Sequence, residues 1–184
     1  IHASAVVDGP CQIGGHSSVL HFSHIMSHVI IGSDCHIGHN VTVGSGVMMG
    51  NGVRVMNNSL LISGVILEDA VYCGPNTVFA QPRRIRGTQP RAVSRITPTL
   101  VRQGSTVAPN VTIASGHTLG RLSFVEAGSV VDRDVPDYAI VSGNPLRLLG
   151  WRCECGEPLP APQRDEVDCL SCGLRYERHY EWKL

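Results

Sequence analysis

The sequence predicts an all-β fold, a parallel β-helix in which short strands wind around a narrow apolar interior. Three observations carry this prediction. Every sixth residue from Ile1 to Phe79 is apolar, and the residue four places after each of these is small or β-branched. Aromatic residues make up only 5% of the chain, whereas Gly occurs 20 times. Thin stacked coils need small and branched side chains, since one six-residue unit cannot bury its own apolar residue.

The repeat also predicts how the coils stack. Three hexads form one triangular turn, so that residues 18 apart lie above one another. Gly occupies the second position of several hexads, as at Gly32, Gly38 and Gly44. We interpret these glycines as corner residues, where the backbone takes a positive φ.

The six-residue pattern divides the chain. It breaks after Phe79 and resumes from Val101 to Val131, so residues 80–100 are predicted to be a loop ejected from the helix. Long loops on rigid scaffolds are commonly functional. We expect a helix over residues 1–135 with this loop at 80–100, a C-terminal cap over 136–151, and a small zinc-ribbon-like tail over 152–184.

The seven cysteines fall into two groups. Cys11, Cys35 and Cys73 occupy interior positions of the repeat and are interpreted as small hydrophobic residues. The other four form a C-x-C-G…C-x-x-C-G pattern that suits tetrahedral zinc, although the first pair is one residue tighter than usual. With four thiolate ligands the zinc would be structural; a redox dithiol or a disulfide is the alternative. The predicted ligands are Cys153, Cys155, Cys169 and Cys172.

Several motifs resemble the hexapeptide-repeat acyltransferases, and most of all the N-acetyltransferases of 3-amino sugars carried by a nucleotide. They are HFSHI at 21–25, MNNS at 56–59, LEDAVYCGPNTVF at 67–79, TLV at 99–101 and DVPDYAIVSGNPLRLLGW at 134–151. The resemblance implies a left-handed β-helix, a homotrimer, and acetyl-CoA or another acyl-CoA bound between subunits. It also implies transfer of the acyl group to the amine of a sugar nucleotide.

Register predicts a polar column on one face. His21, His39 and Asn57 share the third position of hexads 18 apart, with Asn58 adjoining them and His24 one corner away. A neutral imidazole could take the proton of an attacking amine, and a side-chain amide could orient that amine. We predict Asn57 for orientation and His39 as the base. A ladder of solvated turn residues is the alternative.

Charge gives a second indication of ligands. No Asp or Glu occurs between Ala70 and Val125, yet this stretch holds seven arginines. Arg suits phosphate, and both CoA and a sugar nucleotide are polyanions. The loop residues Arg83, Arg84 and Arg86 are predicted to bind the substrate, with a solvated basic loop as the alternative. For CoA, partly from the resemblance, the predicted residues are Asn110, Gly116, His117, Arg121, Arg133 and Arg147.

Two other functions remain open. Where the family commonly has Gly, this chain has Pro109 and Glu126, and Pro109 removes a backbone N–H along the expected CoA track. A binding or scaffold protein with a degraded CoA site is therefore one alternative. A carbonic-anhydrase-like metal hydrase is the other, although the Arg-Gly-Asp and paired-His signatures expected of it are missing.

Bulk properties add little about partners. The formal net charge is zero, which gives no argument for binding nucleic acid or a membrane. No apolar run approaches the ~18 residues of a membrane span. With no recognisable leader at the start and a cysteine pattern that favours metal over disulfides, we expect a cytoplasmic protein.

Overall fold

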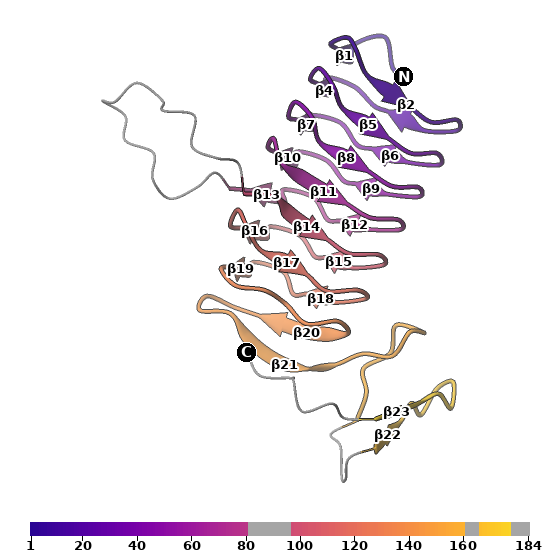
Figure 1. Cartoon of the computed structure of the whole chain (residues 1–184), viewed down its shortest axis with the longest axis vertical. Helices are drawn as coiled ribbons and strands as arrows, with labels where there is room; N and C mark the ends of the chain where they lie inside the picture. The colour runs from indigo at the N-terminus through magenta and orange to yellow at the C-terminus, as the bar shows by residue number, and fades with distance from the viewer. Residues whose placement is uncertain (81–96, 161–165, 178–184) are drawn as a thin grey trace.

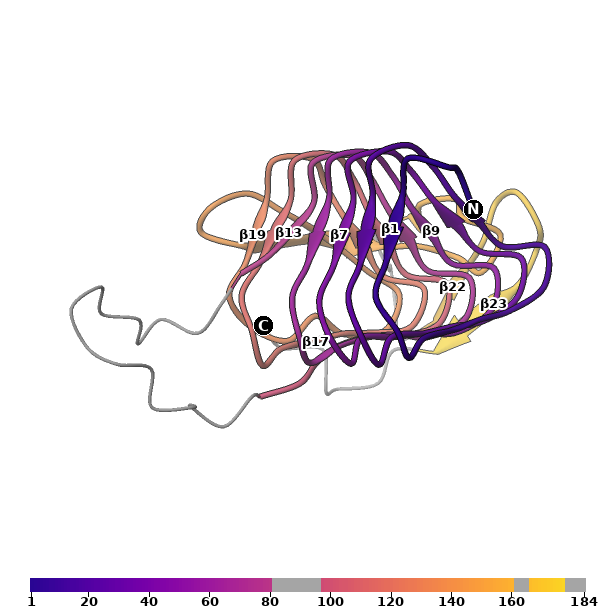
Figure 2. The same ribbon diagram turned by 90° about the horizontal axis from the view of Figure 1, so that it is seen from above.

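The computed structural model describes residues 1–80, 97–160 and 166–177, and these form a three-sided parallel β-solenoid of about seven turns with a small C-terminal hairpin. The described residues contain no helix. Figure 1 shows the coils stacked along the long axis, and Figure 2, a view from above, shows the three flat sides.

Each side of the solenoid is one parallel sheet, and the chain visits the three sheets in turn. Sheet A contains β1 (Val6–Val7), β4 (His24–Ile25), β7 (Thr42–Val43), β10 (Leu60–Leu61), β13 (Val78–Phe79), β16 (Thr112–Ile113) and β19 (Val130–Val131). Sheet B contains β2 (Gln12–Ile13), β5 (Ile30–Ile31), β8 (Met48–Met49), β11 (Val65–Leu67), β14 (Thr99–Val101) and β17 (Thr118–Leu119). Sheet C contains β3 (Ser18–Val19), β6 (His36–Ile37), β9 (Arg54–Val55), β12 (Tyr72–Cys73), β15 (Thr106–Val107), β18 (Phe124–Val125), β20 (Ala139–Ser142) and β21 (Arg147–Trp151).

The predicted 18-residue register is confirmed. His24 pairs with Thr42, and Thr42 pairs with Leu60, in parallel ladders. Across residues 81–96, which lie outside the described part, the step becomes 34, so that Tyr72 pairs with Thr106. The second residue of each strand points inward and is buried, which leaves the first residue on the outer face.

The interior contains the predicted apolar residues. Val43, Leu61 and Phe79 are almost completely buried, and Cys35 and Cys73 are buried among them. Cys11 is half-buried, because it lies near the open N-terminal end. Burial alone raises the pKa of the Cys73 thiol to about 12. These three cysteines therefore behave as predicted, as small core residues.

The role of the second-position glycines differs from the prediction. A Cβ on Gly32 would lie 2.5 Å from the carbonyl oxygen of Gly50 in the next coil, so glycine is needed there for close approach. The positive φ falls two residues later, for example at Asp34 (58°) and Asn40 (55°). Asn and Asp tolerate this conformation better than most residues.

Two predicted boundaries shift. Thr99–Val101 already forms β14, so the segment outside the solenoid ends before residue 100. The helix was expected to end at residue 135, but β20 still pairs in parallel with β18 and adds a last rung. β21 then turns back antiparallel to β20 and closes this end. The tail follows as β22 (Glu166–Asp168) and β23 (Arg175–Glu177), an antiparallel pair seen at the bottom of Figure 1.

Candidate functional site

The predicted polar column exists, at the corner between sheets C and A, which we call the C–A corner. Its backbones stack directly: the N–H of Asn40 donates to the carbonyl of His21, and the N–H of Asn58 donates to the carbonyl of His39, each at 3.0 Å. The same ladder continues to Asn76, whose N–H donates to the carbonyl of Asn57. A column three rungs long thus presents His21, His39 and Asn57 along one edge of the solenoid.

Asn57 has a structural contact as well as a free group. Its Oδ1 accepts a hydrogen bond from the backbone N–H of His39 at 3.1 Å. Its Nδ2 amide makes no hydrogen bond within the described residues. The imidazole of His39 is exposed and likewise has no partner there. The half-buried Asn57 amide is therefore held in place at its oxygen and open to a ligand at its nitrogen.

The other predicted residues of this region have distinct surroundings. The ring of His21 stacks on that of His2, with centroids 3.5 Å apart. Nε2 of His24 lies 2.9 Å from Oδ2 of Asp8, on the outer face of sheet A. Asn58 is exposed and has a φ of 60°. The partner Asp8 was missed by the sequence analysis, because its spacing of 16 residues from His24 does not match the repeat.

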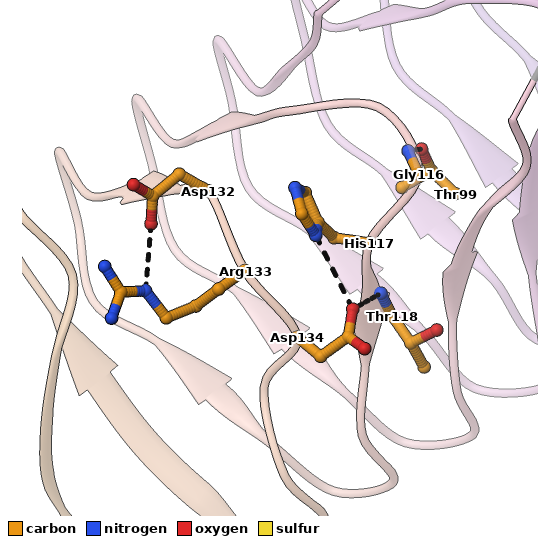
Figure 3. A network of polar contacts seen from close by, with 7 residues as sticks. All are labelled: Thr99, Gly116, His117, Thr118, Asp132, Arg133 and Asp134. Atoms are coloured by element: carbon orange, nitrogen blue, oxygen red, sulfur yellow. Dashed lines mark hydrogen bonds and ion pairs between the residues drawn. The ribbon is translucent and has the colours of Figure 1, made fainter.

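His117 lies at a different edge, the corner between sheets A and B, which we call the A–B corner. Figure 3 shows its ring facing Asp134, with Nδ1 3.6 Å from Oδ1. The same carboxylate accepts a hydrogen bond from the backbone N–H of Thr118 at 2.8 Å. An interior position was predicted for His117, but its side chain is 29% exposed and faces a carboxylate. This is the corner from which residues 81–96 leave the solenoid.

The predicted CoA-binding residues are divided among several edges. Gly116 and Arg133 lie with His117 at the A–B corner, where Nε of Arg133 pairs with Asp132 at 3.1 Å. Asn110 lies at the C–A corner, where its Oδ1 accepts from Nδ2 of Asn76. Arg121 lies at the corner between sheets B and C, and Arg147 is exposed on β21. The structure does not bring these residues together within one chain. Arg83, Arg84 and Arg86 lie outside the described residues.

Pro109 fits the solenoid without cost. Ala108 and Asn110, on either side, donate their N–H groups to the carbonyls of Val125 and Pro75. Pro75 occupies the equivalent place one coil earlier, in the same column as Asn57. A proline is thus accommodated twice at this corner, and the carbonyl of Pro109 still accepts the N–H of Gly128. The departure of Pro109 from the family pattern leaves the scaffold intact.

The four tail cysteines converge, and their geometry fits a tetrahedral metal. Their Sγ atoms all lie within 4.8 Å of one another. The closest pairs are Cys153–Cys172 at 3.4 Å and Cys155–Cys169 at 3.6 Å. A tetrahedral zinc with Zn–S bonds near 2.3 Å requires sulfur atoms about 3.8 Å apart. Both pairs are far longer than a disulfide bond of about 2.05 Å, so the arrangement suits four thiolates around one ion.

The two cysteine pairs sit on similar turns. In the first, the N–H of Cys153 donates to the carbonyl of Glu157 and the N–H of Gly156 donates back to Cys153. In the second, Cys169 and Gly173 make the corresponding bonds, with Leu174 as the acceptor. The first turn spans one residue fewer, which matches its tighter C-x-C spacing. Gly156 and Gly173 both have a positive φ.

The sequence analysis also missed the tyrosines beside this cluster. The hydroxyl of Tyr176 lies 3.0 Å from Sγ of Cys153, and its ring meets that of Tyr138 at 5.9 Å. Neither tyrosine belongs to a motif. In a chain with few aromatic residues, their mere presence near the cysteines was the available signal.

Comparison with known proteins identifies the repeat. Residues 10–45, which include His21, His24 and His39, match the model "Bacterial transferase hexapeptide (six repeats)". The chain carries the bacterial transferase hexapeptide repeat. No described helix of this hexapeptide-repeat solenoid is long and apolar enough to cross a membrane.

Two kinds of relative are similar to this chain. The dTDP-3-amino-3,6-dideoxy-alpha-D-galactopyranose 3-N-acetyltransferase of Aneurinibacillus thermoaerophilus is 40% identical over 79 residues, which are 43% of this chain and 40% of the relative. Serine acetyltransferase 4 of Arabidopsis thaliana is 37% identical over 28% of this chain and 14% of its own length. The chain spans about half the length of the curated relatives that it matches over the longest segments, 40% and 59% for two of them.

Solved structures share the fold. A hexapeptide-repeat acetyltransferase of Vibrio cholerae, complexed with acetyl coenzyme A, is 27% identical with a TM-score of 0.51, over 66% of this chain and 72% of that one. A GDP-perosamine N-acetyltransferase of Caulobacter crescentus, solved with CoA and GDP-perosamine, is 20% identical with a TM-score of 0.55. The match covers 82% of this chain and 55% of that one, and at this identity it supports the fold alone.

Proposed function

We propose that this protein is an N-acyltransferase that moves an acetyl group from acetyl-CoA to the amine of a nucleotide-linked amino sugar. The observation that carries the proposal is the 40% identity to an N-acetyltransferase acting on a dTDP-linked 3-amino sugar. The similar fold of an acetyl-CoA-bound hexapeptide-repeat protein supports the donor. We also infer that the solenoid is left-handed, as in the family that it resembles.

The C–A corner supplies the groups that the reaction needs. In the proposed step the neutral amine of the sugar attacks the thioester carbonyl, the C–N bond forms, and the C–S bond breaks. The free Nδ2 group of Asn57 donates a hydrogen bond that orients the acceptor or the carbonyl. The unpaired imidazole of His39 takes the proton of the amine, unless the leaving thiolate takes it directly. His21, His24 and Asn58 line the same edge.

The division of the CoA candidates favours a site shared between subunits. Asn110 at the C–A corner and His117, Gly116 and Arg133 at the A–B corner flank opposite edges of sheet A. A polyanion lying between two copies could contact one edge of each, with Arg121, Arg147 and the loop arginines Arg83, Arg84 and Arg86 contributing charge. Exposed apolar side chains on the outer faces, including Ile30 and Met48 at 42% exposure, support such association. We therefore propose a homotrimer.

A structural zinc completes the proposal. Cys153, Cys155, Cys169 and Cys172 would provide all four ligands, so the ion would have no open position for substrate. It would stabilise the tail and take no part in acyl transfer. Within the described residues of one chain, no other group of three or more His, Cys, Asp or Glu side chains is placed to hold a metal. The hydrase alternative thus gains no support from the described part.

The test is acetyl transfer to a panel of UDP- and dTDP-linked amino sugars, with the acetylated product measured by mass spectrometry. The Asn57→Ala variant is expected to lose at least tenfold in turnover, because an orienting hydrogen bond is removed from the transition state. Asn51→Ala is the matched control. Oδ1 of Asn51 makes the same bond, to the N–H of Ser33 at 2.9 Å, but at the corner between sheets B and C.

Two results would contradict this function. Equal turnover of Asn57→Ala and Asn51→Ala would remove Asn57 from the site. If the wild-type protein acetylates none of the acceptors and shows no thermal stabilisation by CoA or nucleotides, a non-catalytic scaffold becomes the better account.

A further inference from the structure

The tail is attached to the solenoid through the side chain of Tyr176. Its hydroxyl lies 3.0 Å from Sγ of Cys153 and accepts a hydrogen bond from the backbone N–H of Glu154 at 2.9 Å. With the acceptor lone pair used in this way, the hydroxyl proton is free to be donated to the sulfur. Tyr176 on β23 therefore ties the second half of the tail to the first cysteine turn, next to a predicted metal ligand.

Tyr138 receives this contact on the solenoid side. Its hydroxyl donates to Oε1 of Glu154 at 2.9 Å, and its ring packs edge-on against Tyr176 at 5.9 Å. Two rings and one carboxylate thus bridge the last solenoid turn and the cysteine cluster. Burial and the hydrogen bond to Glu154 raise the pKa of Tyr138, so its hydroxyl remains a donor at neutral pH.

The backbone of Tyr138 is held firmly in an unusual conformation. Its φ is 63°, a region that bulky residues seldom occupy. The N–H of Tyr138 donates to the carbonyl of Arg121 at 2.7 Å, and its carbonyl accepts the N–H of Arg152 at 2.9 Å. Tyr138 lies at the corner that leads into β20, the last parallel strand of the solenoid. Strain of this kind persists only where surrounding contacts impose it.

Arg121 is the end of this chain of contacts. Its guanidinium lies 5.5 Å from the centre of the Tyr138 ring and 3.9 Å from Oδ2 of Asp137. A second cation, Arg152, lies directly before Cys153 and packs its guanidinium over Phe124 on sheet C at 5.5 Å. The first cysteine turn is thus anchored to the solenoid on both sides.

We propose that metal binding by the four tail cysteines locks the last rung of the solenoid, with Tyr176 as the positioning residue that transmits this order through Tyr138 to Arg121. The inference rests on the proposed structural zinc but not on the acyltransferase activity. In the metal-bound protein, the Cys153 thiolate accepts the Tyr176 hydroxyl proton as a hydrogen bond, which fixes both tyrosine rings. Without metal the two cysteine turns separate, and β20 and β21 lose the support of the tail.

The experiment uses full-length protein loaded with one equivalent of Zn²⁺ or, as a spectroscopic probe, Co²⁺. Hydrogen–deuterium exchange is followed in peptides covering residues 137–152 and, as an internal reference, 41–60. Removing the metal with a chelator should speed exchange in 137–152 at least tenfold and leave 41–60 unchanged. Tyr176→Phe should still bind one equivalent of metal, yet speed exchange in 137–152 at least threefold.

Cobalt gives a readout specific to the tyrosine. The hydrogen bond to the Cys153 sulfur is part of the ligand environment, so Tyr176→Phe should shift the sulfur-to-cobalt charge-transfer band. Tyr72→Phe is the matched control, since Tyr72 is half-buried on the outer face of sheet C in β12 and should change neither signal.

The outcomes separate the two proposals. Failure of the wild-type protein to bind zinc or cobalt overturns the metal site and this coupling together, whatever the enzyme assays give. Metal binding with exchange in 137–152 unchanged by chelation, or by Tyr176→Phe, would leave the zinc site standing and contradict the coupling.

Discussion

In the solenoid, Val43 and Ile37 are completely buried between the coils above and below them, whereas the two buried residues of the described tail are Cys153 and Cys169. The first region is held by branched side chains and by backbone ladders that every coil repeats. The second has 21 described residues from 152 on, too few for an apolar core of its own. Regions of this size depend on metal or disulfides, and here the structure gathers thiols.

The largest expected difference between the regions is in metal content. Cys172→Ser should reduce bound zinc from about one equivalent per chain to near zero, because a tetrahedral site loses one of four thiolates. Cys73→Ser should keep the full equivalent, since Cys73 is a core residue of β12. Elemental analysis of the purified variants gives the ratio. A full equivalent of zinc in Cys172→Ser would show that the cysteines do not form the proposed site.

Cysteine reactivity should separate the regions next. Burial raises the pKa of Cys73 to about 12, so on the order of 10⁻⁴ of it is thiolate at pH 8, against roughly a quarter for a free thiol. After chelation, the exposed Cys155 and Cys172 should be alkylated by iodoacetamide at least a thousandfold faster than Cys73. The rate at Cys73 should rise about tenfold per pH unit up to pH 12. Mass spectrometry of digests follows each site, and rapid labelling of Cys73 at pH 8 would refute its burial.

The sequence predicted the solenoid well because a repeat gives each residue a depth. Position in the hexad identified the inner cysteines, and the 18-residue step placed His21, His39 and Asn57 in one column. Depth does not say which of the three corners a residue occupies after a loop of unknown return. The CoA candidates, taken in part from a resemblance, therefore proved to lie at several edges. The β14 boundary was misplaced because Thr99 and Leu100 precede the first clear hexad at Val101.

The tail was predicted only as a ligand set. Spacing identified four cysteines but contained nothing about what they pack against. Tyr138 and Tyr176 meet across 38 residues of chain, and no local pattern encodes such a contact. The extra rung at β20 was missed because its pairing steps by 16 residues, from Phe124 to Ile140, and so leaves the hexad period.

Packing in the two regions should respond unequally to truncation. Phe79→Ala should cost about 3–5 kcal/mol, because Phe79 is the largest completely buried side chain and no neighbouring coil can collapse into its space. Val167→Ala, on the half-exposed β22, should cost less than about 1 kcal/mol. Urea denaturation of zinc-loaded protein measures both. A comparable loss for the two would mean that the tail has a packed core after all.

The smallest effect concerns the side-chain ladder at the corners of the solenoid. Asn51→Ala and Asn57→Ala each remove one hydrogen bond to a backbone N–H of the preceding coil, at 2.9 and 3.1 Å. Each should lower the free energy of unfolding by about 1 kcal/mol, since the freed N–H groups of Ser33 and His39 lie near solvent and can be hydrated. Urea denaturation of the two variants side by side checks this equality. If Asn57→Ala cost several kcal/mol more than Asn51→Ala, the C–A corner would depend on Asn57 for its fold. A loss of turnover in that variant could then no longer be assigned to the free Nδ2 group.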